Sequence, residues 1–207
     1  MELKVAKVNQ VVRGPVNLCN FLVFTILNFM FPNFTADIQR FIKDPHDKRN
    51  IYIIFEQGLW AIAVYRFGRW VRTIPVPIVS HILKVVAFLL FKLMEMITGI
   101  SLPASANIGK GFYVGHFGHV ILHSDVVMGE NCSVGPGVVI GTRGLGNQGV
   151  PAIGNDVYIG VGAKVLGGIK IGNRARIGAN AVVVNDVPEG ATAVGIPAKI
   201  STGIAHD

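Results

Sequence analysis

The second half of the chain repeats an aliphatic residue at every sixth position, and this period limits the possible folds more than any other feature. A six-residue period fits neither an α-helix nor the alternation of a simple strand. It predicts a coil with three short flat faces per turn, in which the repeated residues stack into a continuous core. The repeated residues are Leu102, Ile108, Val114, Leu122, Met128, Val134, Ile140, Ile153, Ile159, Val165, Ile171, Ile177 and Val183. A second small or apolar residue stands two positions before most of them: Ala106, Cys132, Val138, Val157, Ala163, Ile169, Ala175 and Ala181.

Two insertions interrupt this repeat. The spacing between Val114 and Leu122 is eight residues, so two extra residues must leave the coil within 115–121. The spacing between Ile140 and Ile153 is thirteen residues, so the segment 141–152 must leave the coil as a loop. Loops on a rigid scaffold commonly carry function, and we therefore expect the site at these two segments.

Three motifs accompany the repeat: GHFGHVILHS at 115–124, VVIGTRG at 138–144 and GANAVVVNDVPEGATAVGIPAK at 178–199. Together they resemble the hexapeptide-repeat acyltransferases, and specifically the serine acetyltransferase-like branch, which includes polysaccharide and lipopolysaccharide O-acetyltransferases. The resemblance covers residues 44–200. It implies a left-handed parallel β-helix, acetyl-CoA as the co-substrate and a homotrimer, and it leaves a dimer of trimers open.

The composition changes sharply near residue 101. Residues 1–101 hold 12 Lys and Arg against 6 Asp and Glu, whereas residues 102–207 hold 7 against 6, and 21 of the 25 glycines lie in the second part. We expect a basic, apolar, α-helical N-terminal region over 1–100, a left-handed β-helix acyltransferase domain over 101–200 and a C-terminal tail over 201–207. No motif for nucleic-acid binding accounts for the net charge of +7.

Acetyl transfer to a hydroxyl group needs a base, and histidine suits this role at neutral pH. His116 lies in the first insertion and matches the catalytic histidine of the family, so the resemblance implies that it is the base. The alternative is a corner histidine that hydrogen-bonds to backbone carbonyls. We expect His119, in the same insertion, to contact the acceptor, and His123 to point outward in a structural role.

The positions around His116 depart from the family pattern. The carboxylates that orient the family's histidine correspond to Ser101 and Gly115 in this chain. Asp44, followed by Pro45, resembles the family's acceptor-binding Asp-Pro. It is a candidate to bind the acceptor or to orient His116, and the alternative is an ordinary Asp-Pro turn between helices.

The second departure from the family pattern concerns the residues that bind the acceptor. The family's Arg-His pair before the loop-closing proline, which binds a carboxylate, corresponds to Gly149 and Val150 before Pro151. Arg143 is the remaining cation that could serve. These differences favour a sugar hydroxyl in surface-polysaccharide or lipopolysaccharide assembly, with L-serine O-acetylation as the alternative and a non-catalytic scaffold as a further rival.

The resemblance also implies a groove for coenzyme A between neighbouring subunits. Small residues there would allow the backbone to approach the ligand closely. The expected lining residues are Gly141, Thr142, Val161, Gly162, Ala163 and Ala179. Lys199 is expected to bind phosphate, whereas Arg174 and Arg176 are better explained as solvated surface charges.

The N-terminal half contains an uncharged stretch over 14–36, which we interpret as a packing or interfacial helix. Two further helices are expected at about 51–73 and 77–98, the second too rich in charge to span lipid comfortably. Arg66, Arg69 and Arg72 recur every three residues. They form either a patch for an anionic lipid or glycolipid, consistent with peripheral membrane contact through these helices, or an ordinary solvated face.

The chain has two cysteines, Cys19 and Cys132. They cannot form a disulfide framework, and no Cys/His cluster has the spacing of metal ligands, so we expect no metal. A cytoplasmic location is the default expectation, with the inner face of the membrane as the peripheral alternative.

Overall fold

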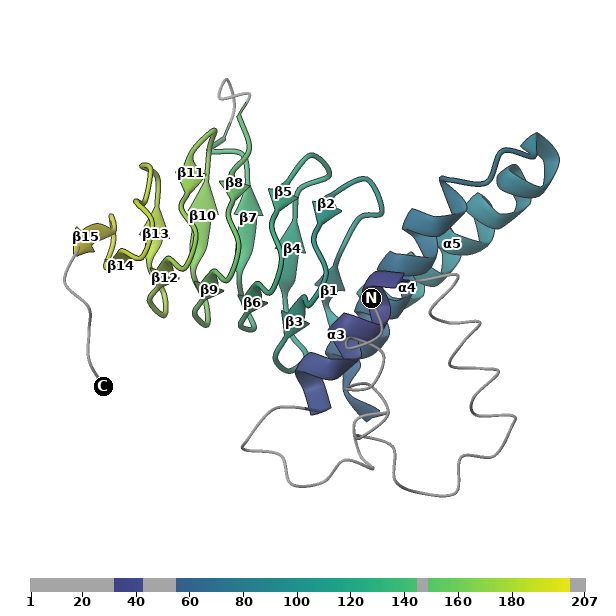
Figure 1. Cartoon of the computed structure of the whole chain (residues 1–207), viewed down its shortest axis with the longest axis horizontal. Helices are drawn as coiled ribbons and strands as arrows, with labels where there is room; N and C mark the ends of the chain where they lie inside the picture. Colours follow the sequence, from purple (N-terminus) through teal and green to yellow (C-terminus); the bar gives the residue numbers. More distant parts are fainter. Residues whose placement is uncertain (1–31, 43–54, 145–148, 202–207) are drawn as a thin grey trace, which may run out of the picture.

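The computed structural model describes residues 32–42, 55–144 and 149–201 of the chain (Figure 1). Helices occupy the N-terminal side and very short strands the remainder. The helices are α3 (Pro32–Ile42), α4 (Gln57–Val71) and α5 (Pro77–Thr98). The strands are β1 (Ile100–Ser101), β2 (Asn107–Ile108), β3 (Tyr113–Val114), β4 (Val120–Leu122), β5 (Val127–Met128), β6 (Ser133–Val134), β7 (Val139–Gly141), β8 (Ala152–Ile153), β9 (Tyr158–Ile159), β10 (Lys164–Leu166), β11 (Lys170–Ile171), β12 (Arg176–Ile177), β13 (Val182–Val183), β14 (Thr192–Val194) and β15 (Lys199–Ser201).

Successive strands enter three different sheets in turn. Sheet A contains β1, β4, β7, β10 and β13; sheet B contains β2, β5, β8 and β11; sheet C contains β3, β6, β9, β12, β14 and β15. Neighbouring strands of each sheet pair in parallel, except β15, which pairs antiparallel with β14. The fold is therefore the predicted left-handed parallel β-helix, preceded by an α-helical region.

The six-residue repeat forms the core, as its period predicts. All the repeated aliphatic residues are buried, with exposed fractions of at most 4%. The second set of small and apolar residues, from Ala106 to Ala181, is buried beside them. Each turn of the coil buries too little apolar surface to be stable alone, and stacking on its neighbours supplies the rest.

The connections between sheets form three edges, and one of them matters for the site. The C–A corner consists of the connections from sheet C to sheet A: 115–119, 135–138, 160–163 and 178–181. The chain turns sharply there with positive φ angles at Gly137 (75°), Gly162 (72°) and Asn180 (56°), which favour glycine and asparagine. Amide groups link successive turns: Gly162 donates to Pro136 at 2.8 Å and Asn180 to Val161 at 2.8 Å.

The helices agree with the expected segments where the structure describes them. Helix α5 begins at Pro77, which suits the first helical position, and ends before Gly99, whose φ of 69° forms a left-handed cap. Helix α4 covers most of the segment expected over 51–73. Of the stretch over 14–36, residues 14–31 lie outside the described residues, and α3 begins at Pro32.

A buried ion pair joins α3, α4 and the first coil. Arg66 donates from Nε to Asp37 Oδ2 at 2.7 Å and from Nη2 to Asp37 Oδ1 at 3.0 Å. The same guanidinium donates to the carbonyls of Ile108 (2.8 Å) and Gly109 (2.6 Å), while the amide of Phe112 donates to Asp37 at 2.8 Å. The expectation that Arg66 belongs to an exposed basic patch is therefore wrong, because this side chain is only 5% exposed.

Tyr65 makes a second link at the same junction. Its hydroxyl donates to the carbonyl of Ala106 at 2.9 Å and accepts from the amide of Ile108 at 3.0 Å. Its ring belongs to the same buried cluster as the β-helix core, together with Phe41 and Ile62. Helices and coil thus share one continuous core, and the helices hold the first coil in place (Figure 1).

Candidate active site

The first insertion forms residues 115–119 at the C–A corner, between β3 and β4. His116 and His119 are both exposed, and both have positive φ angles, of 61° and 40°. Such angles are unfavourable for residues other than glycine and cluster at functional sites. Helix α5 and the neighbouring coil fix the loop: the amide of Gly118 donates to the carbonyl of Thr98, the last residue of α5, at 2.9 Å, and the carbonyl of Gly118 accepts from the amide of Gly137 at 3.0 Å.

Helices α4 and α5 form a hairpin, and the start of α4 and the end of α5 both lie against this insertion and the strand before it. A Cβ atom at Gly99, the cap of α5, would lie 2.9 Å from the amide nitrogen of His119. A Cβ atom at Gly58, in the first turn of α4, would lie 2.2 Å from the carbonyl oxygen of Val114, two residues before His116. The backbone around His116 is thus set by close approaches that require glycine.

Replacing Gly58 with alanine tests this contact. Intrinsic helix propensity alone would make the variant about 1 kcal/mol more stable. We expect the opposite, a lower melting temperature together with a lower kcat for acetyl transfer, because the new methyl group must displace either α4 or the strand that leads to His116. Thermal unfolding and initial-rate kinetics measure both effects. A variant as stable and as active as the parent would contradict the role given to Gly58.

The carboxylates that orient the family's histidine have no counterpart at the matching positions. A Cβ atom at Gly115 would lie 3.2 Å from the Tyr113 ring, so an aspartate there would require that ring to shift by a few tenths of an ångström. Ser101 instead hydrogen-bonds to Glu95, and this bond, after the stronger one from Lys92, lowers the pKa of Glu95. Asp44 lies outside the described residues.

The second insertion leaves the coil at a different corner. It follows β7 of sheet A and returns to β8 of sheet B, so Thr142 and Arg143 lie on the A–B corner, exposed. Gly141 ends β7, and its carbonyl accepts from the amide of Gly167 at 2.8 Å. Sheet A separates this corner from the C–A corner that carries His116. One chain therefore does not bring the two insertions together.

His123 lies on the A–B corner as well. A Cβ atom at Gly141 would lie 3.6 Å from the His123 Cβ atom, so the histidine neighbours the start of the second insertion. The His123 Nδ1 atom accepts a hydrogen bond from the amide of Asp125 at 3.2 Å. This local bond agrees with the structural role expected for His123.

The residues expected to line the donor groove are divided between these corners. Val161, Gly162 and Ala179 lie on the C–A corner, in the same column of turns as His116, and Val161 and Ala179 are exposed. The expectation for Ala163 needs correction, because its side chain is fully buried. Its amide and carbonyl are hydrogen-bonded within the coil to Gly160 (3.2 Å) and Val139 (3.0 Å).

The basic residues of the last coils occupy separate places. Lys199 is exposed in β15, at the C-terminal end of sheet C. Arg174 pairs with Glu189 on the edge between sheets B and C, away from the C–A corner. The Arg176 guanidinium lies over the Tyr158 ring at 5.6 Å. Both arginines thus behave as the surface charges expected of them.

Cys132 is not a nucleophile in this fold. Its side chain is fully buried in the coil, and this burial raises the pKa of the thiol to about 11. The thiol is therefore protonated at neutral pH, whereas the thiolate is the reactive form. Across residues 32–42, 55–144 and 149–201, no group of three His, Cys, Asp or Glu side chains is placed to bind a metal ion.

Comparison with known proteins agrees with this architecture. Residues 151–185 match the family model described as bacterial transferase hexapeptide (six repeats). The chain is 32% identical over 176 residues to a serine acetyltransferase of Synechococcus elongatus, covering 83% of this chain and 68% of the relative. It is 33% identical over 168 residues to a serine acetyltransferase of Helicobacter pylori strain J99, covering 80% and 94%.

Solved structures of serine acetyltransferases also match this architecture. A serine acetyltransferase in complex with CoA superposes with a TM-score of 0.71 at 31% identity, covering 82% of this chain and 68% of that one. A Neisseria gonorrhoeae serine acetyltransferase in complex with serine gives a TM-score of 0.71 at 29% identity, covering 84% and 70%.

A β-helix of hexapeptide repeats, interrupted at these two corners, defines an acyltransferase of the hexapeptide-repeat class. Within that class, the chain belongs to the serine acetyltransferase-like family. It is an acetyl-CoA-dependent O-acetyltransferase. The predicted fold, enzyme class and co-substrate are thereby confirmed.

Proposed function

We propose that His116 is the general base of this O-acetyltransferase. In the proposed step, the imidazole removes the proton of the acceptor hydroxyl while the oxygen attacks the thioester carbonyl. The carbon–sulfur bond then breaks, CoA leaves as the thiol after taking up this proton, and the acceptor becomes an O-acetyl ester. The observation that carries the proposal is an exposed histidine in a strained turn, in the same column as Val161 and Ala179.

We propose further that the complete site forms between subunits of a trimer. In one chain, His116 and the second insertion lie on corners separated by sheet A. A neighbouring subunit that presents its A–B corner to the C–A corner of the first would bring Gly141, Thr142 and Arg143 next to His116. The separation of the two corners supports this arrangement.

L-serine is the first candidate acceptor. The relatives and solved structures described above are all named serine acetyltransferases, and one of the structures was solved with serine. These names favour L-serine over the sugar hydroxyl expected from the sequence, and none of them refers to a polysaccharide or a membrane. Arg143 and His119 are then the proposed contacts to serine, with Asp44 as a further candidate.

A sugar hydroxyl is the second candidate, and Val150 favours it. In the family, a histidine at this position belongs to the pair that binds the serine carboxylate. In this chain Val150 packs against the hydrophobic core instead. A neutral acceptor would need no cation there, whereas serine would require Arg143 to replace the missing pair.

Turnover with the two acceptors tests the proposal. We expect release of the CoA thiol from acetyl-CoA to accelerate on addition of L-serine, well above the rate with buffer alone or with a sugar nucleotide. The variant Arg143→Gln should then raise the KM for serine about tenfold or more, as expected for loss of a charge-assisted hydrogen bond of about 1.5–3 kcal/mol.

The matched control is Arg176→Gln, which removes an arginine from sheet C and should leave the kcat and the KM for serine unchanged. Acceleration by sugar nucleotides and none by L-serine would exclude serine in favour of the second candidate. No acceleration by either, at full occupancy with acetyl-CoA, would contradict both assignments.

A further inference from the structure

Helix α5 exposes an unusual amount of apolar surface. It is 22 residues long, with a mean hydropathy of 1.8 over its most apolar window, and only 6% of that window is buried. By length and composition alone it could cross a membrane, so the expectation that its charges argue against a span does not hold on those two criteria. In the structure it forms a hairpin with α4 that projects from the end of the β-helix (Figure 1). Its most exposed apolar side chains are Ile78, Ile82, Val85, Phe88, Leu89, Met96 and Ile97.

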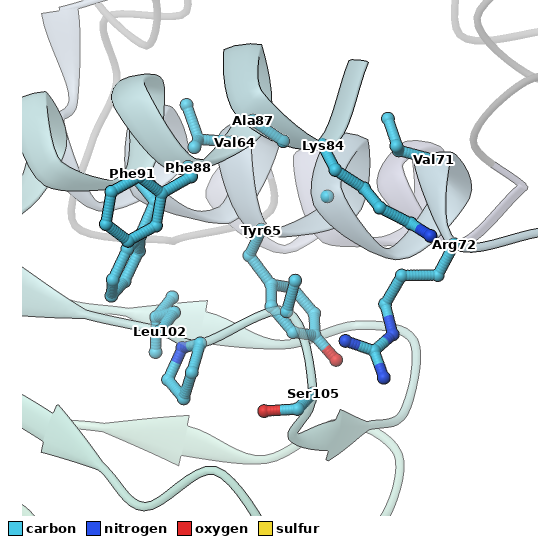
Figure 2. A pocket seen from close by; sticks show the side chains of 13 residues that line it. Val64, Tyr65, Val71, Arg72, Lys84, Ala87, Phe88, Phe91, Leu102 and Ser105 are labelled. Atoms are coloured by element: carbon cyan, nitrogen blue, oxygen red, sulfur yellow. The ribbon is translucent and has the colours of Figure 1, made fainter. Parts of the chain in front are cut away.

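A cavity lies at the base of this hairpin, between α4, α5 and the first coil (Figure 2). Its volume is about 290 Å³, at the lower end of the range for small-molecule sites. The walls are mainly apolar: Val64 and Tyr65 come from α4, Phe88 and Phe91 from α5, and Leu102 from the coil. The hydroxyl of Tyr65 is already hydrogen-bonded to the coil, so the cavity meets the ring rather than a free polar group.

Positive charge is concentrated at one end of this cavity. Figure 2 shows Phe88 and Phe91 at one end and the charged groups of Arg72 and Lys84 toward the other. Among the described residues, neither Arg72 nor Lys84 forms an ion pair with a carboxylate, in contrast to Lys92, which pairs with Glu95 on the same helix at 2.6 Å. An apolar cavity with two cations toward one end, neither of them paired with a described carboxylate, is complementary to an apolar chain that carries an anionic group.

We propose that this cavity binds an acyl chain of an anionic membrane lipid, with Arg72 and Lys84 paired to its phosphate. The exposed apolar face of α5 then lies against the same lipid surface, and the basic residues of the hairpin add favourable electrostatic contact. The site is separate from His116 and does not depend on the identity of the acetyl acceptor.

Two other occupants fit the observations less well. The chain's own segment 14–31 is apolar but carries no charge, so it offers no carboxylate to Arg72 and Lys84. A second copy of the hairpin would bring the same cations toward one another, since the hairpin has more basic than acidic side chains. A lipid phosphate neutralises both cations and covers the apolar wall at the same time.

Binding of n-octyl phosphate to the full chain tests the proposal. Isothermal titration calorimetry, below the micelle-forming concentration, should detect saturable binding of octyl phosphate, at least tenfold weaker binding of 1-octanol and none of inorganic phosphate. The charge-reversal variant R72E/K84E should weaken octyl phosphate binding at least tenfold. Ala87→Phe, which fills the cavity without changing the charge, should weaken it to a similar extent.

The matched control is K110E/K170E, which makes the same change of net charge at two exposed lysines of the β-helix and should bind octyl phosphate like the parent. Flotation with phosphatidylcholine vesicles containing phosphatidylglycerol should recover the parent and the control but not R72E/K84E, and pure phosphatidylcholine should recover less of each. Acetyl transfer by R72E/K84E should remain at the parental rate.

Failure of octyl phosphate to bind the full chain would overturn the proposal. This holds whichever alternative occupant, a second copy or segment 14–31, is then assigned to the cavity. Equal losses of octyl phosphate binding in R72E/K84E and K110E/K170E would also overturn it, because the net charge of the chain would then explain the effect. Either result would leave the acetyl-transfer assays, and therefore the assignment of His116, unaffected.

Discussion

Replacing His116 with asparagine is expected to lower kcat for acetyl transfer by about 10²- to 10⁴-fold, the usual contribution of a general base. Asparagine suits this test because it tolerates the positive φ of 61° at this position, so the turn should keep its shape. The amide cannot accept the proton of the acceptor hydroxyl. Because CoA binding should not depend on the base, the KM for acetyl-CoA should change little.

The measurement is the initial rate of CoA thiol release with saturating acceptor. His81→Asn serves as the matched control: this exposed histidine of α5 hydrogen-bonds to the carbonyl of Pro77 in its own helix, and its loss should leave kcat unchanged. His116→Ala completes the series by removing the polar side chain altogether. If both His116 variants kept the parental kcat with every acceptor, the base would have to be another group.

Replacing Arg66 with methionine is expected to cost about 3–5 kcal/mol of stability, the usual effect of breaking a buried ion pair by removing one partner. Asp37 would remain buried, with only the amide hydrogen bonds near Phe112 to stabilise its charge. Burial already raises the pKa of Asp37, against the opposing effect of Arg66. Since folded domains have about 5–15 kcal/mol in total, this loss should lower the melting temperature by many degrees.

A double-mutant cycle identifies the pair as the cause. Adding Asp37→Asn to Arg66→Met should cost much less than the sum of the single variants, because the uncompensated charge is then gone. Arg69→Met, one turn further along α4, removes an exposed hydrogen bond to Asn107 and should cost less than about 1 kcal/mol. Additive effects of the Asp37 and Arg66 variants would show that the two side chains are not coupled.

The stability of this junction also bears on the site. Arg66 bonds to the carbonyls of Ile108 and Gly109, and Asp37 to the amide of Phe112, all just before the strand that leads to His116. Helix α4 touches that strand again at Gly58. The helices therefore support the first coil from outside, on the side where no preceding coil exists to stack against it.

Much of the fold follows from local periodicity. The repeat predicts which side chains are buried, because a coil of three equal faces returns every sixth residue to the same inward position. The structure buries all of them, from Leu102 to Val183. Even the separation of the two insertions is implicit in the repeat, because the first follows a strand of sheet C and the second a strand of sheet A.

Contacts between segments that are far apart in the sequence could not be predicted from local periodicity. The three-residue spacing of Arg66, Arg69 and Arg72 indicates one helix face, but it does not reveal that Asp37, 29 residues earlier, takes Arg66 out of solvent. Similarly, the sequence contains Gly58 without indicating that a carbonyl oxygen approaches it from Val114. Both contacts depend on how α4 docks on the coil, which no local pattern encodes.

The sequence by itself thus determined the β-helix, the family and the histidine that matches its base, because each depends on short motifs or on a strict period. Only the tertiary structure decided which charges are buried, how α4 and α5 support the turn at His116, and where an apolar cavity lies beside two cations that pair with no carboxylate in the described part of the chain. The physical reason is that burial and charge neutralisation depend on partners brought together in space, and those partners lie far apart along this chain.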